Sequence, residues 1–215
     1  MSEEGAHFYF QKEIPIWNLD KTQNIGKGSI NSNHSNNNQI NYRPNLNLYP
    51  ESGYLVNGLT TKIAIKIKNL KSNIGFNGVI KDSENKIITD FKTSEFGLGL
   101  TYLKPEKNKS YYASIIINDK EEVYPLPKAL DKGYNLEITN LKNQINLKAA
   151  SNTEVGLKNS YLLVHQRGKI IFQKLETKSI NSYFLKLNTN NLKSGVTHFT
   201  LFNNEGKPVC ERLVF

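Results

Sequence analysis

The chain has 215 residues, which suits two domains of roughly 85 to 100 residues, each with a core of its own. Hydrophobic residues make up 38% of the chain, and no run approaches the roughly 20 apolar residues that span a membrane. The net charge is +9, yet only three of the 28 basic residues are arginine, which makes most bidentate phosphate and base contacts. These properties argue against membrane insertion and against a nucleic-acid partner.

The beginning of the chain predicts a single strand that belongs to another domain. Ala6–Trp17 is apolar and aromatic, as the last strand of a sheet is, while Met1–His7 is acidic and polar and does not match a signal peptide. We therefore expect residues 1–17 to be the terminal strand of a preceding domain, and we prefer a segment of a longer protein to a complete cytoplasmic protein.

Residues 18–43 predict a flexible linker. Six of the thirteen positions from Ser29 to Asn41 are asparagine, and such a tract buries too little apolar surface to offset the entropy of ordering it. His34 belongs to this tract. A plain spacer is our preferred interpretation over a protease-sensitive bait.

Residues 44–129 predict a first β-sandwich. The segment Lys62–Lys68 alternates isoleucines with lysines and one alanine, which is the period of a strand with one buried face. Asp82–Asn85 is expected to be the turn of a hairpin, and Gly97 and Gly99 indicate a bulge or a close backbone approach. The expected strands are 62–68, 76–81, 86–92, 99–103, 110–118 and 121–126.

Residues 130–215 predict a second β-sandwich with the same rhythm. Arg167-Gly168 is expected to form a tight turn, and no apolar stripe of helical period persists beyond two turns. The short Pro127–Gly133 connection suggests limited freedom between the two sandwiches. The fold class is therefore all-β, with two tandem antiparallel immunoglobulin-like β-sandwiches. The expected strands are 134–140, 144–149, 161–166, 169–175, 182–187, 196–202 and 208–215.

The search for catalytic, cofactor-binding and metal-binding residues gives none. Gly97-Leu98-Gly99 lacks the third glycine and the following helix of a phosphate loop. Cys210 has no base near it in the sequence and is expected to be a small buried side chain. His165 and His198 are expected to be packed or surface residues of strands, because no spacing links them as metal ligands. We therefore expect no enzyme and no cofactor.

One segment resembles a known family. Leu48–Leu59 reads LYPESGYLVNGL, and it is similar to the opening of macroglobulin-like domains in large Gram-negative envelope proteins that carry a TonB-dependent receptor plug-like domain. There an aromatic residue and Pro-Glu-Gly-Gly precede Leu-Val-x-Gly-Leu, and here Ser52 replaces the first glycine of that pattern. Further similarities follow in chain order, at 78–83, 97–99, 105, 111–113, 124–127, 133–136 and 195–215.

The resemblance implies a non-catalytic structural or interaction module, in the periplasm or associated with the outer membrane. Its partner would be another cell-envelope protein. The alternative is part of a macroglobulin-type protease inhibitor or capture protein whose reactive region lies outside this chain. The thioester of protease-trapping relatives needs Cys-Gly-x-x-Gln, but Cys210 is followed by Glu211 and Arg212. A polysaccharide-binding sandwich is a further interpretation, and it predicts exposed aromatic residues aligned on one sheet face.

Overall fold

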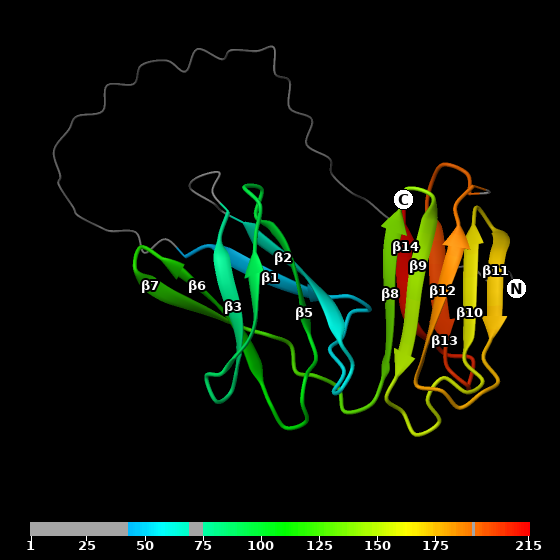
Figure 1. Cartoon of the computed structure of the whole chain (residues 1–215), viewed down its shortest axis with the longest axis horizontal. Coiled ribbons are helices and arrows are strands. Elements are labelled where there is room, and N and C mark those ends of the chain that lie inside the picture. Colours follow the sequence, from blue (N-terminus) through cyan, green and yellow to red (C-terminus); the bar gives the residue numbers. More distant parts are fainter. Residues whose placement is uncertain (1–42, 69–74, 191) are drawn as a thin grey trace, which may run out of the picture. The chain divides into compact units, whose positions relative to one another are not determined.

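The computed structural model describes residues 43–68, 75–190 and 192–215, which Figure 1 draws in colour. The predicted terminal strand at 1–17, and the predicted linker at 18–43 except for Arg43, lie outside the described residues. The described residues form strands, turns and loops, and among them no helix is long and apolar enough to cross a membrane. By its internal contacts, Tyr42–Phe215 is one compact unit.

The first half of the described chain forms seven strands. In β2 the isoleucines at 63, 65 and 67 are buried, while the residues between them face outward, as the alternating pattern predicts. The strands are β1 (Asn45–Pro50), β2 (Thr61–Lys68), β3 (Asn77–Asp82), β4 (Ile87–Lys92), β5 (Leu98–Leu103), β6 (Tyr111–Ile117) and β7 (Lys120–Pro125).

The second half forms seven more strands. The clearest alternation is in β13, where Thr197, Phe199 and Leu201 are buried and the residues between them are partly exposed. The strands are β8 (Tyr134–Leu141), β9 (Gln144–Ser151), β10 (Tyr161–Gln166), β11 (Lys169–Leu175), β12 (Ser182–Asn188), β13 (Thr197–Phe202) and β14 (Pro208–Val214).

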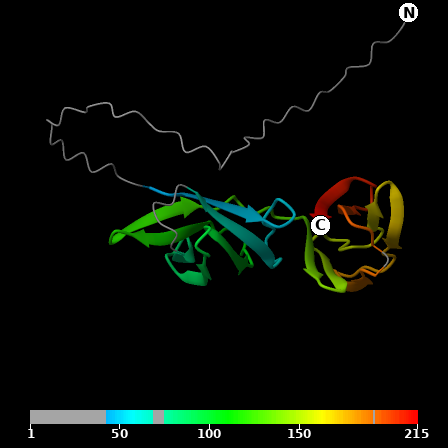
Figure 2. The same ribbon diagram turned by 90° about the horizontal axis from the view of Figure 1, so that it is seen from above.

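Both halves have the same topology. The first, second and fifth strands form one sheet, in the orders β1-β2-β5 and β12-β9-β8, and the other four form a second sheet, in the orders β4-β3-β6-β7 and β11-β10-β13-β14. All pairs within these sheets are antiparallel. Figure 2 shows the second half nearly along its strands, with the two layers facing each other. The predicted fold class, all-β with two antiparallel sandwiches, is confirmed.

Each half has its own hydrophobic core between its two sheets. In the first half, the buried isoleucines of β2 meet Ile80 of β3 and Ile115 of β6. In the second half, Phe199 of β13 packs with Leu147 of β9 and Leu162 of β10 in the same way. Because large apolar side chains from both layers meet in each core, burial of these side chains is the main force that holds each pair of sheets together.

The sequence misses one strand, β1. Its inward residues are only Leu46 and Leu48, and the neighbouring Asn45 and Asn47 are poor strand formers, so propensity gives little signal. Pairing along the whole length of β2 orders this segment instead. The predicted turn at Arg167-Gly168 is confirmed, with φ of 51° and 74°, and the predicted close approach at Gly99 is confirmed because a Cβ there would lie 2.8 Å from the carbonyl oxygen of Lys92.

Asp82 organises the β3–β4 hairpin. Its Oδ1 accepts hydrogen bonds from the backbone N–H groups of Glu84 (2.9 Å) and Lys86 (3.0 Å), and its Oδ2 accepts one from Nζ of Lys109 (2.8 Å). The hydrogen bond from Lys109, helped by the two amides, lowers the pKa of the Asp82 carboxyl below its usual value. The same contact raises the pKa of Lys109. One buried carboxylate thus ties the hairpin to the loop before β6.

This lowered pKa makes stability depend on pH. The folded chain binds a proton at Asp82 less readily than the unfolded chain, so the stabilisation is complete above the unfolded pKa of about 3.9 and is lost as the pH falls through the folded pKa. We expect the free energy of unfolding in urea to fall less steeply below about pH 4 in Asp82→Asn than in the wild type. Glu205→Gln, at an exposed turn position, should follow the wild type. If the free energy of unfolding fell equally steeply with falling pH in all three proteins, this role of Asp82 would be contradicted.

The core of the second half gives a direct stability test. Phe199 is fully buried and Phe184 is 72% exposed, so the same substitution can be compared in two environments. Phe199→Ala should lower the free energy of unfolding by about 3–5 kcal/mol, because it removes apolar contacts and leaves a cavity. Phe184→Ala should change it by less than about 0.5 kcal/mol. The midpoints of urea unfolding curves measure both changes, provided that the dependence of the free energy on urea concentration is unchanged. Comparable losses in the two variants would contradict the different environments of the two rings.

Candidate functional site

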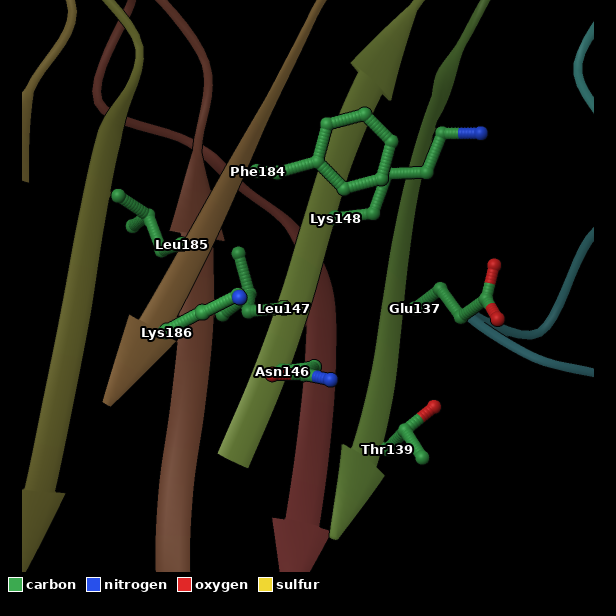
Figure 3. A pocket seen from close by; sticks show the side chains of 8 residues that line it. All are labelled: Glu137, Thr139, Asn146, Leu147, Lys148, Phe184, Leu185 and Lys186. Atoms are coloured by element: carbon green, nitrogen blue, oxygen red, sulfur yellow. The ribbon is translucent and has the colours of Figure 1, made fainter. Parts of the chain in front are cut away.

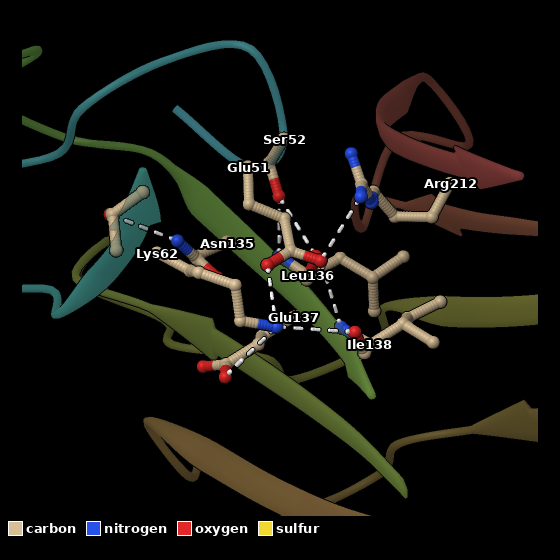
Figure 4. A network of polar contacts seen from close by, with 9 residues as sticks. Glu51, Ser52, Lys62, Asn135, Leu136, Glu137, Ile138 and Arg212 are labelled. Atoms are coloured by element: carbon tan, nitrogen blue, oxygen red, sulfur yellow. Dashed lines mark hydrogen bonds and ion pairs between the residues drawn. The ribbon is translucent and has the colours of Figure 1, made fainter. Parts of the chain in front are cut away.

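A network of polar side chains joins the two halves, and Figure 4 shows it from close by. Its centre is Glu51, which directly follows β1 and is only 5% exposed. Ser52 follows it in the chain, and the other members come from β2, from β8 and from β14, so residues far apart in the sequence meet at one point. We call this group the junction network, and its members are Glu51, Ser52, Lys62, Asn135, Glu137 and Arg212.

The carboxylate of Glu51 receives contacts from both halves. Its Oε1 accepts a hydrogen bond from the backbone N–H of Ile138 (3.1 Å) and lies 3.2 Å from Nη2 of Arg212, both in the second half. Its Oε2 lies 3.2 Å from Nζ of Lys62, in the first half. A buried carboxylate without such partners would be strongly unfavourable, so the geometry requires that both halves stay in place around it.

Ser52 and Lys62 extend these contacts along β8. The hydroxyl of Ser52 accepts a hydrogen bond from the N–H of Leu136 (2.8 Å) and donates to the carbonyl of the same residue (3.1 Å). Lys62 donates to the carbonyl of Ile138 (3.3 Å) and lies 3.5 Å from Glu137. Side chains of the first half therefore form hydrogen bonds with backbone groups of β8. These groups lie along the outer edge of β8, which pairs with no strand of its own sheet.

A second set of contacts lies where the chain passes between the halves. Leu55 and Val56 are fully buried, the N–H of Leu130 donates to the carbonyl of Leu55 (2.8 Å), and the N–H of Asn57 donates to the carbonyl of Leu130 (2.9 Å). The side chain of Asn152 donates to the carbonyl of Asn57 (2.8 Å). The LVNG part of the segment that carries the family resemblance is thus a structural part of the connection.

A shallow hollow of about 230 Å³ lies on the outer face of the β12-β9-β8 sheet, as Figure 3 shows. Two rows of side chains cross this face. In one row Lys148 of β9 lies between Glu137 and Phe184, and in the other Asn146 lies between Thr139 and Lys186. Nζ of Lys148 lies 5.4 Å from the centre of the Phe184 ring, a cation–π contact. The hollow is smaller than typical ligand pockets, so it offers little enclosure to a small molecule.

The two strand histidines lie side by side, which the sequence did not predict. His165 of β10 and His198 of β13 are directly opposite each other, and their rings stack with centroids 4.6 Å apart and planes at 11°. Nδ1 of His198 lies 3.7 Å from Oε1 of Glu211 on β14. No group of three or more His, Cys, Asp or Glu side chains able to hold a metal ion occurs within residues 43–68, 75–190 and 192–215.

Cys210 is buried in the second core, as predicted. Burial raises the pKa of its thiol to about 11, although a hydrogen bond with Ser52 acts in the opposite direction. The thiol is therefore protonated at neutral pH, and only the thiolate is a strong nucleophile.

The comparisons with known proteins add little to this geometry. No protein-family model matches the chain, and no curated protein sequence matches it. Among solved structures, the chain is similar to the human OSCAR ligand-binding domain, at 10% identity and a TM-score of 0.26, over 79% of this chain and 94% of that one. The resemblance to macroglobulin-like envelope proteins stays a prediction.

Sequence reasoning missed the junction network. Glu51 and Arg212 are far apart in the chain, and neither lies in a pattern typical of a buried ion pair. The available signal was weak, because Glu51 directly follows Pro50 at the end of a strand and only two buried apolar residues, Leu55 and Val56, come a few positions later. A charged residue at such a place is partnered when it is buried.

The network predicts a large effect for one substitution. Glu51→Ala leaves Arg212 and the N–H of Ile138 without their carboxylate, so we expect the free energy of unfolding to fall by about 3–5 kcal/mol. The control is Glu84→Ala, whose side chain is 72% exposed and should cost less than about 0.5 kcal/mol. Urea unfolding at neutral pH measures both, and a small loss for Glu51→Ala would mean that water replaces its partners at no cost.

Proposed function

We propose that this chain is a non-catalytic structural and interaction module of a larger exported cell-envelope protein associated with the outer membrane. Its first sandwich would bind another envelope protein, and its junction network would hold the two sandwiches in a fixed arrangement. The envelope location rests on the family resemblance of Leu48–Leu59. The binding role rests on the outer face of the β1-β2-β5 sheet.

The edge strand β5 carries its large apolar residues on the outside. Leu98, Leu100 and Tyr102 are 55%, 51% and 45% exposed, whereas Thr101, which points inward, is buried. In a sheet with one solvated face, polar residues normally stand outward. The reversed pattern in β5 is the observation that carries the proposal, because exposed apolar groups gathered on one face mark an interaction site.

The apolar residues continue across the sheet. Leu100 is opposite Ala64 of β2, and Ala64 is opposite Tyr49 of β1, which is also exposed. We call this surface, made of Tyr49, Ala64, Leu98, Leu100 and Tyr102, the β5 face. Ala64 lies between the larger Tyr49 and Leu100, so it leaves a depression that a partner side chain could fill.

The polar residues around the β5 face favour a protein partner with acidic groups. The outward positions of β1 and β2 hold asparagines and lysines, among them Lys66 and Lys68, and no outward position of these strands or of β5 holds a carboxylate. An apolar centre with a polar and charged rim is the usual anatomy of a protein–protein interface. The outer edge of β5 is partly covered by the segment that follows β4, through the Thr93–Gly99 bridge, so a partner would contact the side chains of the β5 face.

Site-specific photo-crosslinking in the cells that make the parent protein tests this function. A benzophenone amino acid in place of Leu100 should give one discrete adduct with another protein, because the β5 face would be covered there. The control places the same amino acid at Ile116 of β6, which is 69% exposed on a different sheet. It should give no such adduct.

Two results would overturn the proposed role. Equal adducts at positions 100 and 116 would indicate random collisions, and no adduct at position 100 would mean that no protein covers this face. An adduct that resists proteases and is degraded by glycosidases would instead identify a polysaccharide ligand, for which Tyr49 and Tyr102 offer two exposed rings on one face.

A further inference from the structure

The stacked histidines lie on the two central strands of a sheet, close to the end of β10, where His165 is two residues before the Arg167-Gly168 turn. One row of residues crosses the β11-β10-β13-β14 sheet in the order Ile170, His165, His198 and Leu213. The two outer members, Ile170 and Leu213, are 61% and 51% exposed. The two imidazoles thus stand next to each other on adjacent strands, with an exposed aliphatic side chain on either side.

The ring geometry suits neutral imidazoles. Two imidazolium ions whose centres are 4.6 Å apart would repel each other strongly, whereas neutral rings stack without that penalty. Beside the contact between the two imidazoles, the structure places the carboxylate of Glu211 next to His198. Neutral imidazole is also the form of histidine that binds metal ions.

We propose that His165 and His198 form a surface site for a divalent late transition metal of the class of Cu²⁺, Ni²⁺ and Zn²⁺. Imidazole nitrogen suits these ions better than it suits Mg²⁺ or Ca²⁺. Two cis nitrogens at about 2.0–2.1 Å from one ion lie roughly 2.9–3.3 Å apart, so the rings must tilt out of their parallel stack toward a common point. The last side-chain torsion of histidine is broad, and both rings face solvent in part.

Glu211 has a positioning role at this site. Its carboxylate lies on the Nδ1 side of His198, which favours a proton on Nδ1 and leaves the lone pair on Nε2 for the ion. Only two protein ligands are present, so water completes the coordination and remains exchangeable. The site lies in the second sandwich and does not involve the β5 face, so it stands or fails independently of the proposed function.

The chain provides its own matched control, because it has only four histidines and the other two, His7 and His34, precede the described residues. Cu²⁺ titrated into the full chain should give one bound ion per chain, with an electron paramagnetic resonance spectrum split by two nitrogens. His165→Asn and His198→Asn should each reduce the splitting to at most one nitrogen and abolish saturable binding. A chain with both His7→Asn and His34→Asn should bind as the wild type does.

Two further measurements complete the test. Glu211→Gln should weaken binding roughly tenfold without changing the number of coordinating nitrogens, as loss of an orienting partner does. Thermal unfolding without metal establishes that each variant is folded, and Zn²⁺ should raise the unfolding temperature only of proteins that keep both His165 and His198. Binding that survives His165→Asn, binding that is lost in the His7 and His34 variant, or no binding by the wild type would each overturn the proposal.

Discussion

The buried carboxylate of Glu51 is the constraint on which the arrangement of this protein depends. It belongs to the first sandwich by sequence, but two of its three partners, Ile138 and Arg212, belong to the second. Desolvating a charge is costly, so the contacts with Lys62, Ile138 and Arg212 are needed together. The hydrogen bond from the N–H of Ile138 to Glu51, and those between Ser52 and Leu136, are directional and set the register of β8 against the end of β1.

Local patterns predicted most of the fold because a strand with one buried face has apolar residues at alternate positions of its sequence. The isoleucines of Lys62–Lys68 and the turn at Arg167-Gly168 needed no knowledge of the rest of the chain. The histidine pair could not be predicted in this way. His165 and His198 meet because the third and sixth strands of the second half are neighbours, and strand order is set by the packing of the whole sandwich. The junction network was hidden for the same reason.

The two halves repeat one topology and differ in what their equivalent faces present. The fifth strand of the first half, β5, exposes Leu98, Leu100 and Tyr102, whereas the fifth strand of the second half, β12, exposes Phe184 among polar neighbours and a lysine. The inward positions are constrained by packing in both halves, and the outward positions are not. A single architecture therefore supports different surfaces, and function must be argued from those surfaces and not from the fold.

The polar character of the junction bears on how the chain is made. Ribosomal synthesis proceeds from the N-terminus, so the residues of the first sandwich are made before those of β8 and β14. Its junction surface includes Glu51, Ser52 and Lys62, which water solvates well, beside the apolar Val56, and its core holds Leu55. A wholly apolar junction would expose a large apolar surface, which favours aggregation, until the second sandwich has folded. The first sandwich instead offers a largely polar surface, which loses its water only when the second sandwich folds against it.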